Sequence, residues 1–404
     1  MRILFTCQAA LPHLFPMIPL AWALRAAGHE VRIASGSPVV DQIVHTGLPA
    51  VSLDYGRQWS DAEVKNRVAD IWGQDAWPPH WAENLDQLSQ KQHAYLRKLG
   101  GNLVHTADVV TDELIDFART WRPNMIVYDA ISYGGAVTAG LLGVPGVKHM
   151  FGTATVPRLE LTPDGEPLPE YVRLFESRGV SAAYTPTVLV DPTPLSLRIV
   201  TEADRINMRH VPYNGPGVVP DWVALPPSRP RVCFTWGHTG PRSLGQDAVA
   251  PYRSAIEAIA ELDVEIVVAS TAAQLDLLGE LPAVTHRVAS LPLNLILPHC
   301  DVLVHQGGDG TVLAAAAAGV PQLVISRKPD AETPASRIAA AGAALWLRYQ
   351  ELRKDPNRSA RIRDAVRDLL TDPAFRTAAN RLRAENEHQP PPAEVVPRLE
   401  ELAS

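Results

Sequence analysis

The stretch "DVLVHQGGDGTVLAAAAAGVPQLVIS", residues 301–326, contains an apolar run, a glycine loop, an alanine-rich run and a second apolar run. Short apolar runs bounded by glycine and proline are typical of buried strands, and the alanine-rich run between them predicts a helix. Two strands joined by such a helix are parallel, with a right-handed crossover. The stretch therefore predicts one unit of an open parallel α/β sheet.

The same alternation occurs on both sides of a proline-rich segment. Residues 1–35 read as strand, helix and strand, and a second alternating series starts at residue 231. The intervening segment 211–230 has too many prolines and glycines for a regular element, which indicates an interdomain linker. We therefore predict an α/β fold with an N-terminal domain over 1–210 and a C-terminal domain over 231–385.

Composition narrows the class of protein. The chain has 404 residues, a formal net charge of -7 and an ordinary hydrophobic share of 46%, which disfavours both disorder and nucleic-acid binding. Cys7, Cys233 and Cys300 are too far apart for a disulfide framework or a zinc site. Prolines and His13 interrupt the apolar N-terminus, and no run reaches the ~20 residues of a spanning helix. A cytoplasmic protein without a membrane anchor or nucleic-acid partner is expected.

The glycine loop lies where an open parallel sheet binds ligands, after a strand and before a helix. Backbone N–H groups at Gly307, Gly308 and Gly310, together with the positive helix N-terminus, are suited to an anion such as a diphosphate. Thr311 is expected to cap the helix or donate its hydroxyl, and His305 to donate an imidazole N–H to a phosphate oxygen. The alternative is a tight turn that holds no ligand. The loop is neither a P-loop nor a dinucleotide fingerprint.

Two further residues bear on this loop. Gly237 and Thr239 belong to a second strand-then-glycine turn, "WGHTG", which could face the same diphosphate. Asp309 places a carboxylate among the glycines. One interpretation directs it away from the phosphates, where it accepts N–H bonds at the helix start. The other directs it to a sugar or acceptor hydroxyl, or to a cationic amino group.

His13 and Asp129 are the candidate catalytic residues. His13 follows the first strand, and Asp129 ends another strand of the same predicted sheet. An imidazole suits general-base work near neutral pH, and a carboxylate on its second nitrogen would fix its tautomer. Alone, each residue has a plain alternative, a solvent-exposed or capping histidine and a helix-capping acid. No metal site is expected, because the chain has no Asp-x-Asp pair and no His-x-x-x-His pattern.

Four of the nine tryptophans lie within residues 59–81. One interpretation is a helical insertion whose indoles pack on the first domain. The other is an aromatic pocket for a flat apolar substrate. Both can hold at once.

At this point the motifs resemble a known family. "LFTCQAALPHLFPMIPLAWALRAAGHEVRIAS", "MIVYDAISYGGAV", "YNGPGVVPDW", "RVCFTWG" and the opening stretch are similar to actinobacterial natural-product glycosyltransferases of the UDP-glucuronosyltransferase-like superfamily. The resemblance spans nearly the whole chain. It implies the GT-B fold, two Rossmann-like domains facing across a cleft, with a C-terminal helix at about 386–404 packing back on the first domain.

The resemblance also implies a reaction. A (deoxy)sugar moves from a dTDP-sugar co-substrate to a polyketide-type or other aglycone with inversion, without a metal or other cofactor. His13 matches the general base and Asp129 its acidic partner. The donor-binding positions are Gly237, Thr239, Ser290, Leu291, His305, Gly307, Gly308, Asp309, Gly310, Thr311, Asp330 and Glu332. The acceptor-binding positions are Trp72, Trp77, Trp81 and Phe151.

The chain departs from the superfamily at the sugar site. The common Asp-Gln pair becomes Asp330 and Ala331, which suits a sugar with fewer hydroxyls, and Glu332 is a candidate to compensate. Two other functions keep the architecture: a GT-B sugar-nucleotide epimerase, and a non-catalytic helper of a glycosyltransferase. A homodimer and an auxiliary activator protein are further partners that the resemblance leaves open.

Overall fold

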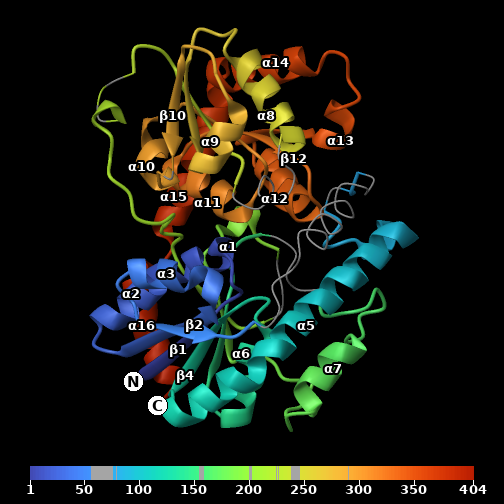
Figure 1. Cartoon of the computed structure of the whole chain (residues 1–404), viewed down its shortest axis with the longest axis vertical. Helices are drawn as coiled ribbons and strands as arrows, with labels where there is room; N and C mark the ends of the chain where they lie inside the picture. The colour runs from blue at the N-terminus through green and yellow to red at the C-terminus, as the bar shows by residue number, and fades with distance from the viewer. Residues whose placement is uncertain are drawn as a thin grey trace.

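The computed structural model describes residues 1–55, 76–78, 80–153, 159–199, 203–223, 225, 227–237, 246–289 and 291–404, without the side chains of 246–251 and 287. Within these residues the strands form two parallel sheets, one in each half of the molecule (Figure 1). The predicted α/β architecture with two parallel sheets is confirmed.

The N-terminal sheet of the described chain has seven strands in the order β3-β2-β1-β4-β5-β6-β7. All its strand pairs are parallel. The strands are β1 Arg2–Thr6, β2 Glu30–Gly36, β3 Ala50–Leu53, β4 Met125–Asp129, β5 Gly146–His149, β6 Val188–Asp191 and β7 Arg205–Asn207. The sequence pattern did not predict β3, β6 and β7, which have four, four and three residues.

The C-terminal sheet has six strands in the described residues, in the order β10-β9-β8-β11-β12-β13. Counted from β8, this is the order 3-2-1-4-5-6 of a Rossmann fold. Its strands are β8 Arg231–Phe234, β9 Glu265–Ser270, β10 Thr285–Ala289, β11 Val302–His305, β12 Gln322–Ser326 and β13 Ala344–Arg348. The alternation read from the sequence therefore gives every strand of this sheet.

Helices connect the parallel strands and cover both sheets (Figure 1). In the first half they are α1 Leu11–Leu14, α2 Ile18–Ala26, α3 Ser37–His45, α5 Gln90–Trp121, α6 Tyr133–Leu142 and α7 Pro169–Glu176. In the second half they are α8 Gln246–Ile259, α9 Ala272–Leu278, α10 Leu293–Ile296, α11 Asp309–Ala318, α12 Pro329–Ala340, α13 Tyr349–Leu352, α14 Arg358–Thr371, α15 Pro373–His388 and α16 Pro392–Leu402. The short 3-10 helices are η1 Phe15–Met17, η2 Leu85–Gln87, η4 Leu195–Leu197, η5 Asp221–Val223 and η7 Leu297–His299.

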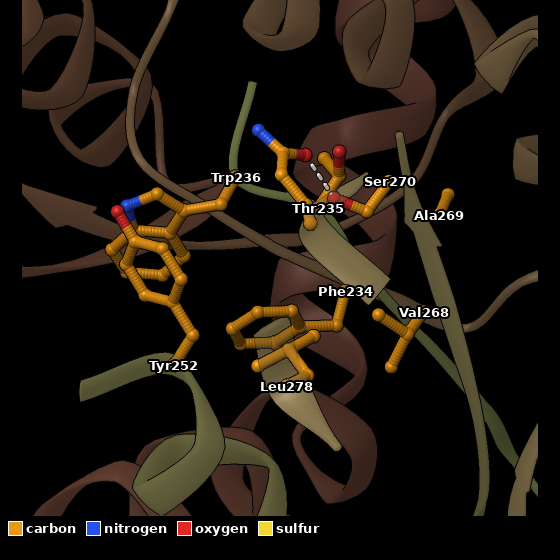
Figure 2. Close-up of a pocket in the computed structure, with 9 residues that line it drawn as sticks. Phe234, Thr235, Trp236, Tyr252, Val268, Ala269, Ser270 and Leu278 are labelled. Atoms are coloured by element: carbon orange, nitrogen blue, oxygen red, sulfur yellow. Dashed lines mark hydrogen bonds between the residues drawn. The ribbon is translucent and has the colours of Figure 1, made fainter. Parts of the chain in front are cut away.

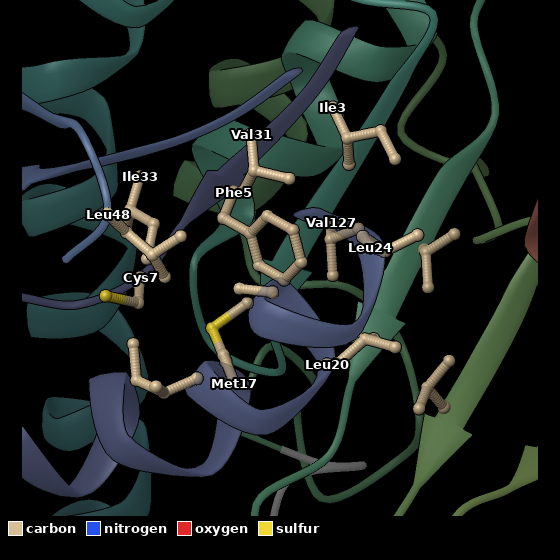
Figure 3. Close-up of a cluster of buried hydrophobic side chains, with 14 of the residues drawn as sticks. Ile3, Phe5, Cys7, Met17, Leu20, Leu24, Val31, Ile33, Leu48 and Val127 are labelled. Carbon is tan, nitrogen blue, oxygen red and sulfur yellow. The ribbon is translucent and has the colours of Figure 1, made fainter. Parts of the chain in front are cut away.

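The core of the N-terminal domain forms between β1 and α2. Phe5 of β1, Met17 of η1 and Leu20 of α2 are fully or almost fully buried. Figure 3 shows these side chains directed into one cluster, with Leu24 one turn further along α2. The 3.6-residue period of α2 and the two-residue alternation of β1 bring these apolar side chains together, which anchors the start of α1 at the carboxyl edge of the sheet.

The last helix belongs to the first domain's core. Val395, Val396 and Leu399 of α16 are buried in the same cluster as Phe5. In Figure 1, α16 (red) lies beside α2 (blue) near the N-terminus. The side-chain amide of Asn386 accepts the backbone N–H of His210 and donates to its carbonyl, and so pins the chain where it crosses between domains.

Because Leu399 is fully buried, replacing it with alanine should open a cavity in the first domain. We expect Leu399→Ala to lower the free energy of unfolding by about 2–4 kcal/mol, measured by urea denaturation. The neighbouring Arg398→Ala is the control, since its side chain is 68% exposed. Equal stability of the two variants would show that α16 does not contribute to this core.

Candidate active site

The two sheets each have a topological switch point, and the candidate site residues lie at both. In an open parallel sheet, ligands bind beyond the carboxyl ends of the strands where the strand order reverses. The first switch point lies between β1 and β4. His13 follows β1, and Asp129 is the last residue of β4. The second lies between β8 and β11, which Gly237 and the glycine loop follow.

His13 and Asp129 are in direct contact. The Nδ1 atom of His13 lies 3.1 Å from Oδ1 of Asp129, although the two residues are 116 positions apart. The Asp129 side chain is almost fully buried, whereas that of His13 is 17% exposed. The short helix α1, with a proline in its first turn, places His13 over the end of β4.

The surroundings of Asp129 keep its carboxylate ionised. Oδ2 accepts hydrogen bonds from the Gln8 backbone N–H, at 2.8 Å, and from the Ser132 hydroxyl, and Oδ1 accepts the Ile131 N–H at 3.1 Å. Burial alone would raise the pKa of Asp129, but His13 and these hydrogen bonds lower it below its usual value. An ionised partner requires a proton on Nδ1 of His13. Nε2 of the neutral ring is then the nitrogen that can take a proton.

Phe151 lies beside this pair. It follows β5, and its ring meets the His13 imidazole edge-on, with centroids 4.7 Å apart and an interplanar angle of 75°. The contact limits how the imidazole can rotate, so the ring is held by Asp129 on one side and by Phe151 on another.

The glycine loop has the geometry of a tight turn into a helix. Gly307 has a φ of 91°, and a Cβ there would lie 3.0 Å from side-chain atoms of both Ala331 and Val324. Gly308 is the N-cap residue of α11, and its carbonyl accepts the backbone N–H of Thr311 and of Val312. The start of α11 thus directs backbone N–H groups and the positive end of the helix dipole at the switch point.

The structure places His305 beneath the glycine loop, inside the C-terminal domain. The side chain is fully buried, and its Nδ1 accepts the Gly307 backbone N–H at 3.1 Å. Nε2 lies 2.9 Å from Oε1 of Gln322, whose amide nitrogen donates to the Val312 carbonyl. Nε2 therefore carries the proton and donates it to Gln322, which leaves no N–H for a phosphate. His305 shapes the loop from below.

The turn after β8 adjoins the glycine loop. A Cβ on Gly237 would lie 2.4 Å from Nε2 of Gln306, and the Gly237 carbonyl accepts Nε2 of Gln274 at 2.9 Å. Beneath this turn is a small apolar pocket, in which Trp236 and Tyr252 pack with ring centroids 3.9 Å apart (Figure 2). The aromatic packing supports the turn from beneath. Because Gly237 lies against Gln306, the two turns are neighbours at the carboxyl edge of the sheet.

At the start of α12, the two predicted sugar-binding acids differ in exposure. Asp330 is exposed, whereas Glu332 is 1% exposed, because two residues along a helix turn the side chain to the opposite side. The Glu332 carboxylate accepts hydrogen bonds from Ser326, at 2.8 Å, and Arg348, at 3.2 Å. Both hydrogen bonds lie inside the C-terminal domain, so the structure gives Glu332 a packing role, and its sugar-binding role stays a prediction. Leu291 is half-buried and packs against the linker at Gly217.

The structure places Trp77 and Trp81 in a packed cluster. Both indoles are buried and pack on each other with centroids 4.9 Å apart, in a small cluster with Tyr95. Nε1 of Trp81 donates to the Pro329 carbonyl at 2.9 Å, so this segment is anchored beside Asp330. The interpretation of a packed insertion holds for these two residues.

Trp72, Thr239 and Ser290 lie outside the described residues. In the part of the chain that the structure describes, no group of three His, Cys, Asp or Glu side chains is arranged to hold a metal ion. No helix among the same residues has the length and hydropathy needed to cross a membrane.

The contact between Asp309 and Thr153 was not predicted from the sequence. Oδ1 of Asp309 accepts two hydrogen bonds from Thr153, one from its backbone N–H at 2.7 Å and one from its hydroxyl at 2.8 Å. Neither interpretation of Asp309 included this partner. The available signal was position, since Thr153 follows β5 at the carboxyl edge that also carries Asp129.

Comparison with known proteins identifies the family. Residues 22–237 match the N-terminal domain of erythromycin biosynthesis protein CIII-like proteins, and residues 253–402 match their C-terminal domain. The chain belongs to the EryCIII-like family. It is 35% identical to the 10-deoxymethynolide desosaminyltransferase of Streptomyces venezuelae, over 100% of this chain and 97% of that protein. It is 33% identical to the tylactone mycaminosyltransferase of Streptomyces fradiae, over 100% and 93% of the two chains.

Solved structures agree with this assignment. The EryCIII-like chain superposes on spinosyn rhamnosyltransferase SpnG complexed with thymidine diphosphate, with a TM-score of 0.84, 29% identity and coverage of 99% and 100% of the two chains. It also matches the glycosyltransferase VinC in complex with dTDP, with a TM-score of 0.81, 32% identity and coverage of 100% and 99%. The protein is a nucleotide-sugar-dependent glycosyltransferase with the GT-B fold.

Buried histidines make the fold sensitive to acid. Burial lowers the pKa of His149, His210 and His305 to about 4. Between pH 6.5 and 4 the unfolded chain binds three protons that the folded chain does not. The free energy of unfolding therefore falls as the pH is lowered, by about 3 kcal/mol per histidine. Glu332 acts in the opposite sense, because burial raises its pKa to about 7 and the folded chain binds its proton first as the pH falls.

Because three histidines oppose the single glutamate, the free energy of unfolding decreases overall as the pH is lowered. We expect the urea midpoint to fall steeply between pH 7 and pH 4.5, and His149→Gln to make that fall shallower. The control is His45→Gln, at an exposed position of α3. A pH slope that is equal in both variants and in the parent protein would contradict this explanation.

Proposed function

We propose that this EryCIII-like glycosyltransferase moves a deoxysugar from a dTDP-sugar to a hydroxyl of a polyketide-type aglycone, with inversion and without a metal ion. One observation carries the proposal. A histidine–carboxylate pair at one switch point is joined, through Phe151 and Thr153, to a helix N-terminus at the other. A base and an anion site that meet at a domain boundary are suited to transfer from a nucleoside diphosphate.

The relatives support the substrate class. Those compared above are named for desosaminyl and mycaminosyl transfer, and a further relative is named a TDP-daunosamine transferase. Thymidine diphosphate is bound in the solved relatives. A dTDP-activated deoxysugar is the donor that these names share. The three cysteines are free and buried, which suits the cytoplasm that we propose as its location.

The reaction begins at His13. Its Nε2 takes the proton of the acceptor hydroxyl, and the carboxylate of Asp129 stabilises the imidazolium that forms. The acceptor oxygen then bonds to the anomeric carbon from the face opposite the diphosphate. The bond between that carbon and the phosphate oxygen breaks at the same time, and its electron pair leaves with dTDP. Attack on the opposite face inverts the anomeric centre.

The leaving diphosphate is stabilised at the start of α11. Backbone N–H groups at Gly308 and Gly310, the hydroxyl of Thr311 and the helix dipole supply the positive charge that a divalent ion would otherwise provide. His305 contributes indirectly, by holding the Gly307 N–H in the turn. This division of work needs no metal ligand.

The sugar end of the site fits a donor with few hydroxyls. Ala331 packs on Gly307, directly beside the loop, where the superfamily commonly has a glutamine. A sugar hydroxyl with no partner in a buried site costs about 1–3 kcal/mol. We propose that Asp330, which is exposed next to this position, contacts the sugar and that Phe151 and Trp72 contact the aglycone.

Replacing the base should abolish transfer. We expect His13→Ala to lower kcat by about 10³-fold, in the range of general-base catalysis, while dTDP affinity stays within twofold. Transfer is followed by mass spectrometry of the glycosylated product, and dTDP binding by calorimetry. His45→Ala, on the surface, is the control. Near-normal turnover of His13→Ala, or an isomerised sugar nucleotide in place of a glycoside, would reject the mechanism.

A substitution in the donor loop should instead weaken dTDP binding. We expect Thr311→Val to weaken dTDP binding about tenfold, since a hydrogen bond to a charged group contributes about 1.5–3 kcal/mol. Thr120→Val, on the exposed surface of α5, should leave the affinity unchanged. If Thr311→Val binds dTDP as the parent protein does, the hydroxyl does not contact the diphosphate.

A further inference from the structure

Asp309 connects the two domains by a short and well-directed contact. Its Oδ1 atom accepts both the N–H and the hydroxyl of Thr153, a residue 156 positions earlier in the chain. Thr153 is 4% exposed and Asp309 is half-buried, so the hydrogen bonds are partly shielded from water. Charge-assisted hydrogen bonds of this kind are about twice as strong as neutral ones.

The backbone of the first domain is shaped for this contact. A Cβ on Gly152 would lie 2.3 Å from Cβ, Cγ and Oδ1 of Asp309, closer than any side chain can approach. Gly152 also has a φ of 159°. The glycine therefore allows the chain to pass directly over the carboxylate, and Thr153 then turns both of its donors to it.

The contact links the base to the donor loop through a short series of contacts. Thr153 is two residues after Phe151, whose ring lies edge-on against His13. Asp309 is the first residue of α11 and directly follows Gly308. Moving Asp309 relative to Thr153 would thus shift the base relative to the helix start that is proposed to bind the diphosphate.

We infer that Asp309 is a positioning residue: its hydrogen bonds to Thr153 hold the acceptor domain in register with the donor loop, so that His13 and the anomeric carbon meet. The inference rests on the proposed function for its effect on rate. The dipole of α11 stabilises the ionised carboxylate at the start of the helix. The carboxylate oxygen in turn accepts its hydrogen bonds from Thr153, in the acceptor domain. Misplacing reacting groups by about 1 Å can cost 100-fold in rate.

The substitutions separate this role from a chemical one. We expect Asp309→Ala to lower kcat about 10- to 100-fold with dTDP affinity within threefold. Asp309→Asn should retain kcat within about fivefold, because its amide oxygen can accept both hydrogen bonds. Thr153→Val removes one of the two donors and should lower kcat by a smaller factor. The double variant Asp309→Ala, Thr153→Val should be no slower than Asp309→Ala alone.

A second measurement needs no substrate. The Thr153 amide should be protected from hydrogen exchange in the parent protein and in Asp309→Asn, and lose protection in Asp309→Ala, as read by mass spectrometry with residue-level fragmentation. Thr120→Val is the control for the threonine substitution, and Asp116→Ala, on an exposed turn of α5, for the aspartate. Neither should change exchange at Thr153.

The outcomes are distinct. If Asp309→Asn is as slow as Asp309→Ala while Thr153→Val is normal, the carboxylate acts on substrate and the inference is overturned. Unchanged kcat in all variants, or unchanged exchange at Thr153 in Asp309→Ala, overturns it as well. If the parent protein transfers no sugar, the proposed function fails, and the exchange measurement still decides whether the contact orders Thr153.

Discussion

The site depends on one hydrogen bond, from Nδ1 of His13 to Oδ1 of Asp129. An ionised carboxylate that is fully buried is stable only when its oxygens are paired. The N-terminal sheet meets that condition with donors from Gln8, Ile131 and Ser132 in addition to the imidazole. The same bonds fix the histidine tautomer and leave Nε2 as the proposed base. The strand order β1-β4 brings the two residues together, since Asp129 ends β4 and His13 lies in α1, which follows the carboxyl end of the neighbouring strand β1.

The second domain has the complementary role in the proposed reaction, which is to bind the diphosphate without a metal ion. Its loop presents backbone N–H groups and a helix N-terminus, and a neutral histidine beneath the loop holds the turn. Burial keeps His305 neutral, with its pKa lowered to about 4, so it shapes the turn without adding positive charge. The turn that holds Gly237 lies against Gln306 and completes the same edge. In the proposed reaction each domain therefore supplies one half of the site, and we infer that the rate depends on how the two domains are held together.

Much of this arrangement could be predicted from the sequence. Strand and helix periodicity places His13, Asp129 and the glycine loop at carboxyl edges of parallel sheets, because those positions follow from order along the chain. The partners of His305, Glu332 and Trp81 could not be predicted, for a common reason. Each contact depends on which way a side chain points and on a partner distant in sequence: Gln322 for His305, Arg348 for Glu332 and Pro329 for Trp81. The contact of Asp309 with Thr153 joins segments 156 residues apart; the sequence indicates that both follow strands at carboxyl edges, but not that they pair.

The central claim is that the glycine loop and His13 serve one reaction centre across the domain boundary. A crystal structure of the protein with dTDP tests it most directly. The account predicts that the diphosphate lies within hydrogen-bonding distance of backbone N–H groups in residues 308–311, with Nε2 of His13 directed at the space beyond the terminal phosphate. A diphosphate bound elsewhere on the C-terminal domain, or a His13 whose Nε2 faces away from that space, would contradict it.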